Sequence, residues 1–150
     1  GTLRSAAARD SASYCDALWP AQAGEPCAVY VIGIGGEWTF AEYALSKGCE
    51  VHAYDPTVEL RARHRRSASR MSKTHFHFAG LGGSLTASKR TGGARAADSI
   101  NSYGTIDEAR LMTLEEMVAR RPRGAAPIRV LTIDCEGCEW AAIEHLAHNS

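Results

Sequence analysis

Apolar residues in the middle of the chain come in short unbroken runs, with a stretch of helical periodicity between them. Residues 29–34 form the first run and residues 51–54 form the second. Between them, Phe40, Tyr43 and Ala44 recur at the spacing of one helix face. An unbroken apolar run is typical of a strand that is buried on both faces of a parallel sheet. The pattern therefore predicts a strand, a helix and a second strand, which together make one βαβ unit.

The segment after the second predicted strand is first basic and then alternates between polar and apolar residues. Its cations are Arg61, Arg63, Arg65, Arg66, Arg70 and Lys73. A basic stripe can bind nucleic acid, but the absence of interleaved aromatic residues favours a solvated helix face. Residues 75–79 then alternate between polar and apolar side chains, which predicts a third strand with His75 and His77 on one face. A structural role is the favoured interpretation of both histidines, and a catalytic base is the open alternative.

The last third of the chain returns to strand and helix patterns. Residues 84–103 are rich in small and polar residues and predict a surface excursion or a hairpin. Thr113 and Glu116 match a capping box at the start of a short helix. Residues 128–133 predict a fourth strand, and a final helix follows. The expected inward face of this helix consists of Trp140, Ile143 and Ala147.

This order of elements predicts an α/β fold, a Rossmann-like doubly wound and mostly parallel sheet joined by right-handed crossovers. Doubly wound sheets usually have more than four strands, so we expect the C-terminal strands to be lacking and the domain to be incomplete at that end. We expect residues 1–24 to be a lead-in segment, either a helix or partly ordered. Residues 25–150 are expected to form the single domain.

Composition and charge narrow the classes of partner. The chain of 150 residues is 45% hydrophobic and 23% charged, with a formal net charge of +0, which are ordinary globular values. A chain without net charge has no overall electrostatic attraction to nucleic acid. No apolar run approaches the ~20 residues that span a bilayer. We therefore predict no nucleic-acid partner and no membrane segment in this chain. The chain begins with Gly1 rather than Met, so its sequence leaves the compartment open.

The five cysteines suggest neither a disulfide framework nor a metal site. Cys27 opens the first predicted strand and Cys49 opens the second, so the fold could bring them together. Two buried thiols are the favoured interpretation, and a disulfide is the alternative. Cys135 and Cys138 form a C-x-x-C motif that no second ligand pair completes as a zinc site. We predict no metal and interpret this pair as small residues in a tight turn.

A glycine-rich turn follows the first predicted strand. Gly33, Gly35 and Gly36 allow a sharp turn and the close approach of a ligand. A dinucleotide fingerprint requires a further glycine where this chain has Trp38. The bulk of that side chain disfavours an NAD-dependent oxidoreductase and favours a cofactor without a pyrophosphate, such as S-adenosylmethionine.

Carboxylates follow the second and the fourth predicted strands. Asp55 could accept hydrogen bonds from both ribose hydroxyls of a nucleoside, and an Asp-Pro turn is the structural alternative. Asp134 and Glu136 should face the same cleft, since ligands of open α/β sheets bind beyond the carboxyl ends of the strands. They could hold a cation, orient an acceptor or accept its proton. Glu139 is interpreted as a helix cap.

Two blocks of sequence resemble those of a known family. The segment VYVIGIGGEWTFAEYALSKGCEVHAYDP resembles the first motif block of class I S-adenosylmethionine-dependent methyltransferases, especially the FkbM-type group and its methyltransferase-like relatives. LTIDCEGCEW is similar to that group's KIDxEGxEW block, and TLEEM is similar to its usual helix start. The resemblance extends from about Cys27 to Leu146. It implies S-adenosylmethionine as cofactor and O-methylation of a hydroxyl or carboxyl group on a small-molecule or glycan-like acceptor.

The resemblance also implies which residues form the site. Asp55 would contact the ribose, and Asp134 with Glu136 would line the methyl-transfer cleft as the catalytic residues. Ile32 stands where many class I enzymes have an acidic residue, so a non-catalytic cofactor-binding or interaction module is the alternative function. The full predicted cofactor-binding set is Gly33, Ile34, Gly35, Gly36, Trp38, Asp55 and Pro56.

Overall fold

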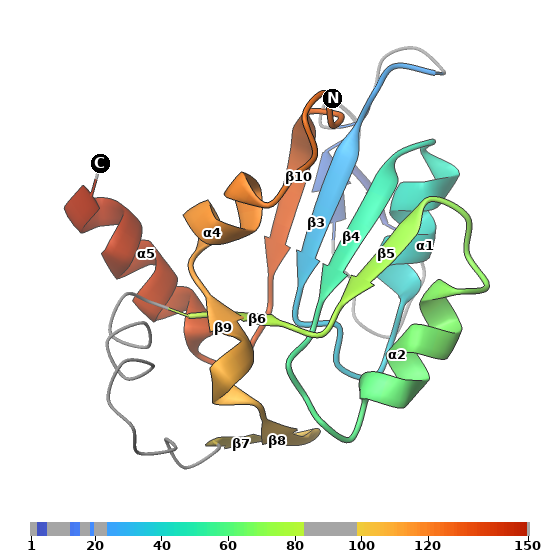
Figure 1. Ribbon diagram of the computed structural model, residues 1–150. Coiled ribbons are helices and arrows are strands. Elements are labelled where there is room, and N and C mark those ends of the chain that lie inside the picture. The colour runs from blue at the N-terminus through green and yellow to red at the C-terminus, as the bar shows by residue number, and fades with distance from the viewer. Residues whose placement is uncertain (1–2, 6–12, 16–18, 20–23, 83–98, 150) are drawn as a thin grey trace.

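The computed structural model describes residues 3–5, 13–15, 19, 24–82 and 99–149. Its centre is a four-stranded sheet in the order β10-β3-β4-β5, and every neighbouring pair is parallel. Figure 1 shows these strands side by side, with helices around them. The strands are β3 (Ala28–Ile32), β4 (Glu50–Tyr54), β5 (Thr74–His77) and β10 (Ile128–Ile133). The predicted α/β fold with a mostly parallel sheet is confirmed.

Helices connect the strands as the apolar pattern predicts. The predicted capping box is confirmed, because the Thr113 hydroxyl accepts from the amide of Glu116 and the Glu116 carboxylate accepts from the amide of Thr113. Helix α1 ends just before Gly48, whose φ of +85° is the left-handed conformation of a helix C-terminus. The helices are α1 (Thr39–Ser46), α2 (Arg61–Ala68), α4 (Leu114–Ala119) and α5 (Cys138–Asn149). None of the helices in the described ranges is long and apolar enough to cross a membrane.

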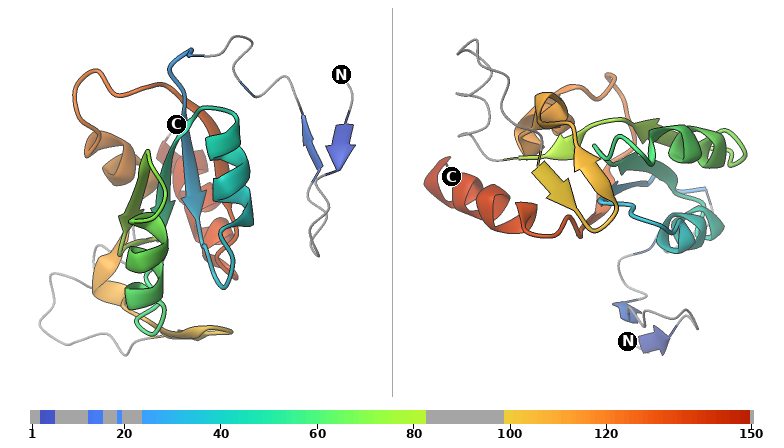
Figure 2. Two further views of the ribbon diagram at one scale, coloured as in Figure 1. Left: turned by 90° about the vertical axis from the view of Figure 1, so that its right-hand side faces the viewer. Right: turned by 90° about the horizontal axis from the view of Figure 1, so that it is seen from below.

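The remaining elements are short. In the lead-in segment the expectation of a helix is wrong for residues 3–5 and 13–15, which form an antiparallel strand pair. Figure 2 shows this pair set apart from the α/β body. Trp19, by contrast, is buried against the rings of Phe40 and Tyr43. The short elements are β1 (Leu3–Ser5), β2 (Ser13–Cys15), β6 (Gly80–Leu81), β7 (Ser99–Asn101), β8 (Gly104–Ile106), η2 (Glu108–Arg110) and β9 (Leu111–Met112).

The core has two layers, one on each face of the sheet. Side chains alternate along a strand, so Val29 and Val51 pack toward α1 and α2, whereas Tyr30 and Ile32 pack toward α4 and α5. Figure 2 shows α1 and α4 on opposite sides of the sheet. Both layers are apolar, which explains why β3 is an unbroken apolar run.

The expected inward face of α5 is wrong. Trp140 and Ile143 are 77% and 56% exposed, and Ala147 is exposed as well. The helix instead packs through Cys138 and Ala142, one turn apart, against the layer that contains Tyr30 and Ile32. Strand β10 is at the edge of the sheet, so no element of the described chain lies where the predicted face would pack. That further strands complete the sheet stays a prediction.

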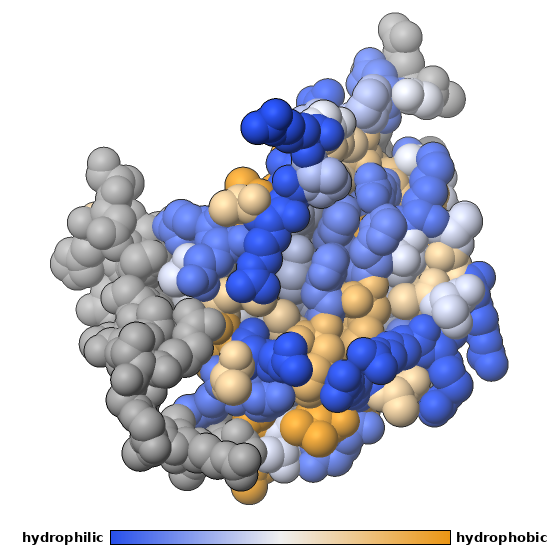
Figure 3. All heavy atoms as spheres, viewed as in Figure 1, coloured by the Kyte–Doolittle hydropathy of each residue, from blue (hydrophilic) through white to orange (hydrophobic). Residues whose placement is uncertain are grey.

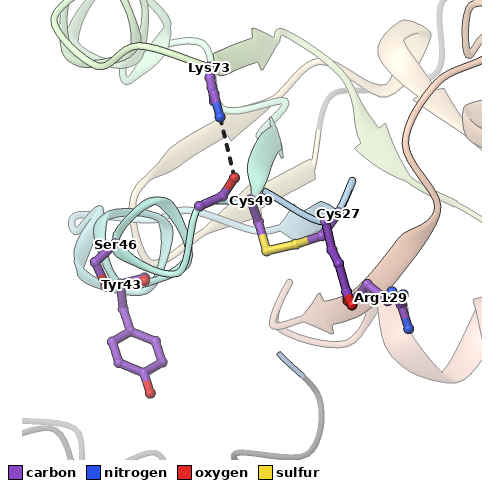
Figure 4. The surroundings of a disulfide bond; sticks show 8 residues. Cys27, Tyr43, Ser46, Cys49, Lys73 and Arg129 are labelled. Atoms are coloured by element: carbon purple, nitrogen blue, oxygen red, sulfur yellow. Dashed lines mark hydrogen bonds and ion pairs between the residues drawn. A yellow bond between two sulfur atoms is a disulfide. The ribbon is translucent and has the colours of Figure 1, made fainter. Parts of the chain in front are cut away.

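The preference for free thiols at Cys27 and Cys49 is also wrong. The two residues form a disulfide between the residue before β3 and the residue before β4, as Figure 4 shows. Both are almost completely buried, at 3% and 0% exposed. Parallel pairing of the two strands brings their first residues together, so the bridge follows from the register. A second disulfide joins Cys135 and Cys138.

Removal of the Cys27–Cys49 bridge is expected to lower the free energy of unfolding by about 3 kcal/mol, because the bridge closes a long loop of the unfolded chain. The double replacement Cys27→Ser with Cys49→Ser tests this in a urea titration. The matched control replaces Cys135 and Cys138, which are three positions apart and should contribute only about 2 kcal/mol. Alkylation of both Cys27 and Cys49 in the folded protein without reductant would contradict the bridge.

Candidate functional site

A cavity of about 250 Å³ lies beyond the carboxyl ends of β3, β4 and β10. The chain runs from β3 outward to β5 and then returns to β10 on the other side of β3. The strand order therefore reverses between β3 and β10, which is where open α/β sheets bind ligands. The predicted site residues that line this cavity are Gly33, Gly35, Asp55, Pro56, Asp134 and Glu136.

The glycine turn can form only without side chains at two positions. Gly33 has a φ of +83°, and a Cβ added to it would lie 1.8 Å from the carbonyl oxygen of Asp134. Gly35 has a φ of +57°, and its Cβ would lie 2.9 Å from the ring of Tyr103. The turn therefore lies directly against the segment after β10 and leaves open space above the strand ends.

Asp55 fixes the glycine turn to the end of β4. Its side chain is buried, and Oδ2 accepts hydrogen bonds from the amides of Ile34 at 3.2 Å and Gly35 at 3.0 Å. Oδ1 accepts from the amide of Thr57 at 2.9 Å. Burial alone would raise the pKa of the Asp55 carboxyl, but the hydrogen bonds from His64, Thr57 and Gly35 outweigh it and lower the pKa. The side chain is therefore an anion that holds the turn.

His64 completes this arrangement from helix α2. The indole nitrogen of Trp38 lies 3.1 Å from His64 Nδ1. Because an indole N–H only donates, Nδ1 must be the acceptor. The proton of the neutral ring is therefore on Nε2, which faces Asp55 Oδ2 at 3.5 Å. The sequence gives no signal for this role, because His64 stands among the arginines of a basic helix, and only the structure shows that His64 and Ala68 are the buried positions of α2.

Three predicted cofactor-binding residues lie beside the turn and do not line the cavity. Trp38 is 8% exposed and belongs to the core layer under α1 and α2. Ile34 packs in the same layer. The carbonyl of Gly36 accepts a hydrogen bond from Arg63 at 2.6 Å, which also fits the solvated helix face expected for the basic segment.

A small hairpin covers the cavity from the side. Strands β7 and β8 pair antiparallel, and the turn between them contains Ser102 and Tyr103. The backbone of Thr57 forms an isolated bridge with Ile106 of this hairpin. The prediction of an excursion or hairpin over residues 84–103 is confirmed for its described end, and residues 83–98 lie outside the described residues. That this hairpin reaches the site was not predicted.

The carboxylates after β10 have separate partners. Glu136 has a φ of +55° and accepts from the amide and the hydroxyl of Ser102, at 3.0 and 2.6 Å. These bonds from Ser102 lower the pKa of the exposed Glu136 carboxyl. Glu139 accepts from the amides of Cys135 and Gly137, both at 2.7 Å, so its predicted capping role is confirmed. Asp134 is exposed at the cavity wall.

The Glu136–Ser102 contact is expected to hold the hairpin over the cavity. Replacing Glu136 with glutamine removes the charged acceptor, so hydrogen exchange of the hairpin amides should become faster while β3 and β4 keep their protection. Glu59→Gln is a matched control, because Glu59 accepts from Thr105 on the other hairpin strand. It should speed exchange at Thr105 first. Unchanged exchange at Ser102 and Tyr103 in Glu136→Gln would contradict this role.

A comparison with protein families gives a match. A family model described as a methyltransferase domain matches residues 8–148. No curated protein and no solved structure matches the chain. The matched region includes the whole parallel sheet, the glycine turn and the carboxylates after β4 and β10. The chain therefore belongs to this methyltransferase domain family.

Proposed function

We propose that this chain binds S-adenosylmethionine in the cavity and transfers the methyl group to a hydroxyl or carboxyl oxygen, as class I enzymes of the FkbM type do. One observation carries the proposal. The carboxyl ends of β3, β4 and β10 meet at a single cavity in a chain of a methyltransferase family. A small-molecule or glycan-like acceptor is the proposed substrate class.

The residues around the cavity fit this cofactor better than a dinucleotide. Asp134 and Glu136 give the wall negative charge, which suits a sulfonium cation. A pyrophosphate needs positively charged side chains or free backbone amides around it. The described residues that line the cavity include no lysine, arginine or histidine. The amides of Ile34 and Gly35 are already bound by Asp55. This donor set supports a cofactor without phosphates.

Asp55 is the proposed acceptor for a ribose hydroxyl. It lines the cavity, and Oδ1 accepts from one backbone amide, that of Thr57, whereas Oδ2 accepts from two. A ribose O–H would donate to Oδ1 in competition with the Thr57 hydroxyl, which also bonds the carboxylate, while Oδ2 keeps the glycine turn in place. In this proposal Asp55 therefore shapes the turn and positions the nucleoside with the same side chain.

The bound cofactor supplies an electrophilic methyl group on a positively charged sulfur. Asp134 and Glu136 would orient the acceptor oxygen or accept its proton, and their charge would favour the cation in the ground state. The rate enhancement would come largely from holding donor and acceptor in line. Tyr103 and Ile100, on the hairpin beside the cavity, would limit the access of water.

A non-catalytic module is the second candidate function. Ile32 is buried at 1% exposed, so it offers no acidic contact to a methionine ammonium group. Both oxygens of Glu136 are bound to Ser102, which leaves it less free to act on an acceptor. These observations favour a domain that binds the cofactor or a partner protein without turnover.

Calorimetric titration with S-adenosylhomocysteine and, separately, with NADH tests the proposal. We expect binding of the first at one site per chain and no binding of the second. Methyl transfer from a labelled donor to a panel of hydroxyl and carboxyl acceptors then separates the enzyme from the non-catalytic module. Binding of NADH alone would contradict the proposal, and binding of S-adenosylhomocysteine without turnover on any acceptor would favour the second candidate.

A further inference from the structure

A cluster of histidine and glutamate side chains lies on β4 and β5. It is separate from the proposed cofactor cavity, which lies beyond the carboxyl ends of the strands. Glu50 and His52 belong to β4, and His75 and His77 belong to β5. The parallel register places His52 beside His75. Glu50 is the first residue of its strand, so the cluster begins at the amino-terminal end of the sheet. In Figure 3 the upper part of the face turned to the viewer carries mostly hydrophilic residues.

The side chains converge on one carboxylate oxygen. His75 Nε2 lies 2.7 Å from Glu50 Oε1, and His52 Nε2 lies 3.4 Å from the same atom. One ligand atom from each of the three residues can be chosen so that all lie within 4.8 Å of one another. A tetrahedral zinc ion, with bonds of about 2.0–2.2 Å, requires ligand atoms about 3.3 Å apart. Small side-chain rotations would therefore close this cluster around an ion.

His77 supports His52 in the way that an outer partner supports a metal ligand. His52 Nδ1 lies 3.1 Å from His77 Nε2, and the two rings stack at 5.4 Å. An outer hydrogen bond of this kind fixes the orientation of a ligand imidazole.

Two proton arrangements are compatible with this hydrogen bond. In one, His77 donates to His52 Nδ1 and His52 Nε2–H points to Glu50. In the other, His52 Nδ1–H donates to His77, which leaves a lone pair on His52 Nε2 facing the Glu50 carboxylate. In the second arrangement the lone pair of His52 Nε2 and the Glu50 carboxylate face each other, so a cation between them would be stabilising. Metal-binding histidines usually donate their other N–H to such an outer partner, as His52 would to His77.

The surroundings permit entry of an ion. The side chains of His75 and Glu50 are 50% and 36% exposed, so the open side of the cluster faces solvent. A second cavity of about 260 Å³ lies on the inner side, lined by His52 and His77. Arg121 also lines this cavity, and its charge opposes a cation. The carboxylate of Glu50 lies directly in the cluster and compensates for that charge.

We propose that Glu50, His52 and His75 form a binding site for one divalent transition-metal ion, with Zn²⁺ as the best match. Two imidazoles and a carboxylate suit Zn²⁺, Ni²⁺, Co²⁺ or Cu²⁺, whereas Mg²⁺ and Ca²⁺ prefer oxygen ligands alone. The ion would join the edge strand β5 to β4. The site is separate from the proposed cofactor cavity, so it does not depend on the proposed function.

Calorimetric titration of chelator-treated full chain with ZnSO₄ tests the proposal, with MgCl₂ as the parallel ligand. The protein carries no histidine tag and stays without reductant, so that the bridged cysteines do not bind metal. We expect one Zn²⁺ per chain and no binding of Mg²⁺. His75→Ala and Glu50→Gln should each weaken Zn²⁺ binding by about tenfold or more, whereas Glu42→Gln on α1 should leave it unchanged.

A spectroscopic measurement keeps the result independent of folding effects. Bound Co²⁺ should give an absorption spectrum typical of tetrahedral nitrogen and oxygen coordination, and His75→Ala should lose it while circular dichroism shows an unchanged fold. His75 is half exposed, so its truncation should not unfold the chain. Absence of Zn²⁺ binding to the wild type, or binding unaffected by both His75→Ala and Glu50→Gln, would overturn the proposal.

Discussion

Replacing Gly33 with alanine is expected to lower the free energy of unfolding by about 4 kcal/mol. Part of the loss, about 1–2 kcal/mol, comes from the φ of +83°, which residues with a Cβ rarely adopt. The rest comes from the carbonyl oxygen of Asp134, which would lie 1.8 Å from the new Cβ. This oxygen belongs to the backbone and cannot rotate away. The change would therefore push the ends of β3 and β10 apart, as a urea titration can measure.

Gly48→Ala is the matched control for this prediction. Gly48 has nearly the same φ, +85°, but a Cβ there would have no atom within 4 Å. It should therefore lose only the conformational part, about 1–2 kcal/mol. Equal losses in the two variants would show that the contact with Asp134 contributes nothing. We also expect Gly33→Ala to abolish binding of S-adenosylhomocysteine, while Gly48→Ala retains it.

Replacing Asp55 with alanine is expected to lower the free energy of unfolding by about 4 kcal/mol, because it leaves the amides of Ile34, Gly35 and Thr57 without their acceptor. Asp55→Asn keeps one acceptor oxygen and should fold, so it isolates the effect on the cofactor. In that variant we expect the affinity for S-adenosylhomocysteine to fall by about tenfold or more, since the loss of one charged hydrogen bond costs about 1.5–3 kcal/mol. Wild-type affinity in Asp55→Asn would contradict the ribose contact.

The pH dependence of stability gives an independent check on Asp55. Its pKa is lowered in the folded state, so its contribution is complete above the unfolded value of about 3.9. The contribution is lost as the pH falls below that value toward the folded pKa. Asp55→Asn should be less stable than the wild type at neutral pH, with the difference shrinking in acid. Asp107→Asn, which alters an exposed acceptor for the amide of Ala109, should show a much smaller difference.

Much of the sheet could be predicted because its signals are local. The unbroken apolar run of β3, the capping box of α4 and the alternation of His75 to Phe78 each specify one element without distant partners. The position of Asp55 at the end of β4 could be predicted for the same reason. Its hydrogen bonds to the glycine turn could not, because they join residues about twenty positions apart.

The features that the sequence did not reveal depend on packing between distant segments. The orientation of α5 is fixed by what lies beside the edge strand, which the periodicity of Trp140 and Ile143 does not encode. His64 reads as one more polar residue of a basic helix until α2 packs it against Trp38. The disulfide of Cys27 and Cys49 follows only once the parallel register of β3 and β4 is known.

A crystal structure of the protein with S-adenosylhomocysteine would show whether the strand ends form the cofactor site. We expect the ligand beyond the carboxyl ends of β3, β4 and β10, with a ribose hydroxyl within hydrogen-bonding distance of Asp55 Oδ1 and the sulfur beside Asp134. Density for the ligand at any other place on the molecule would rule out the proposed cofactor site.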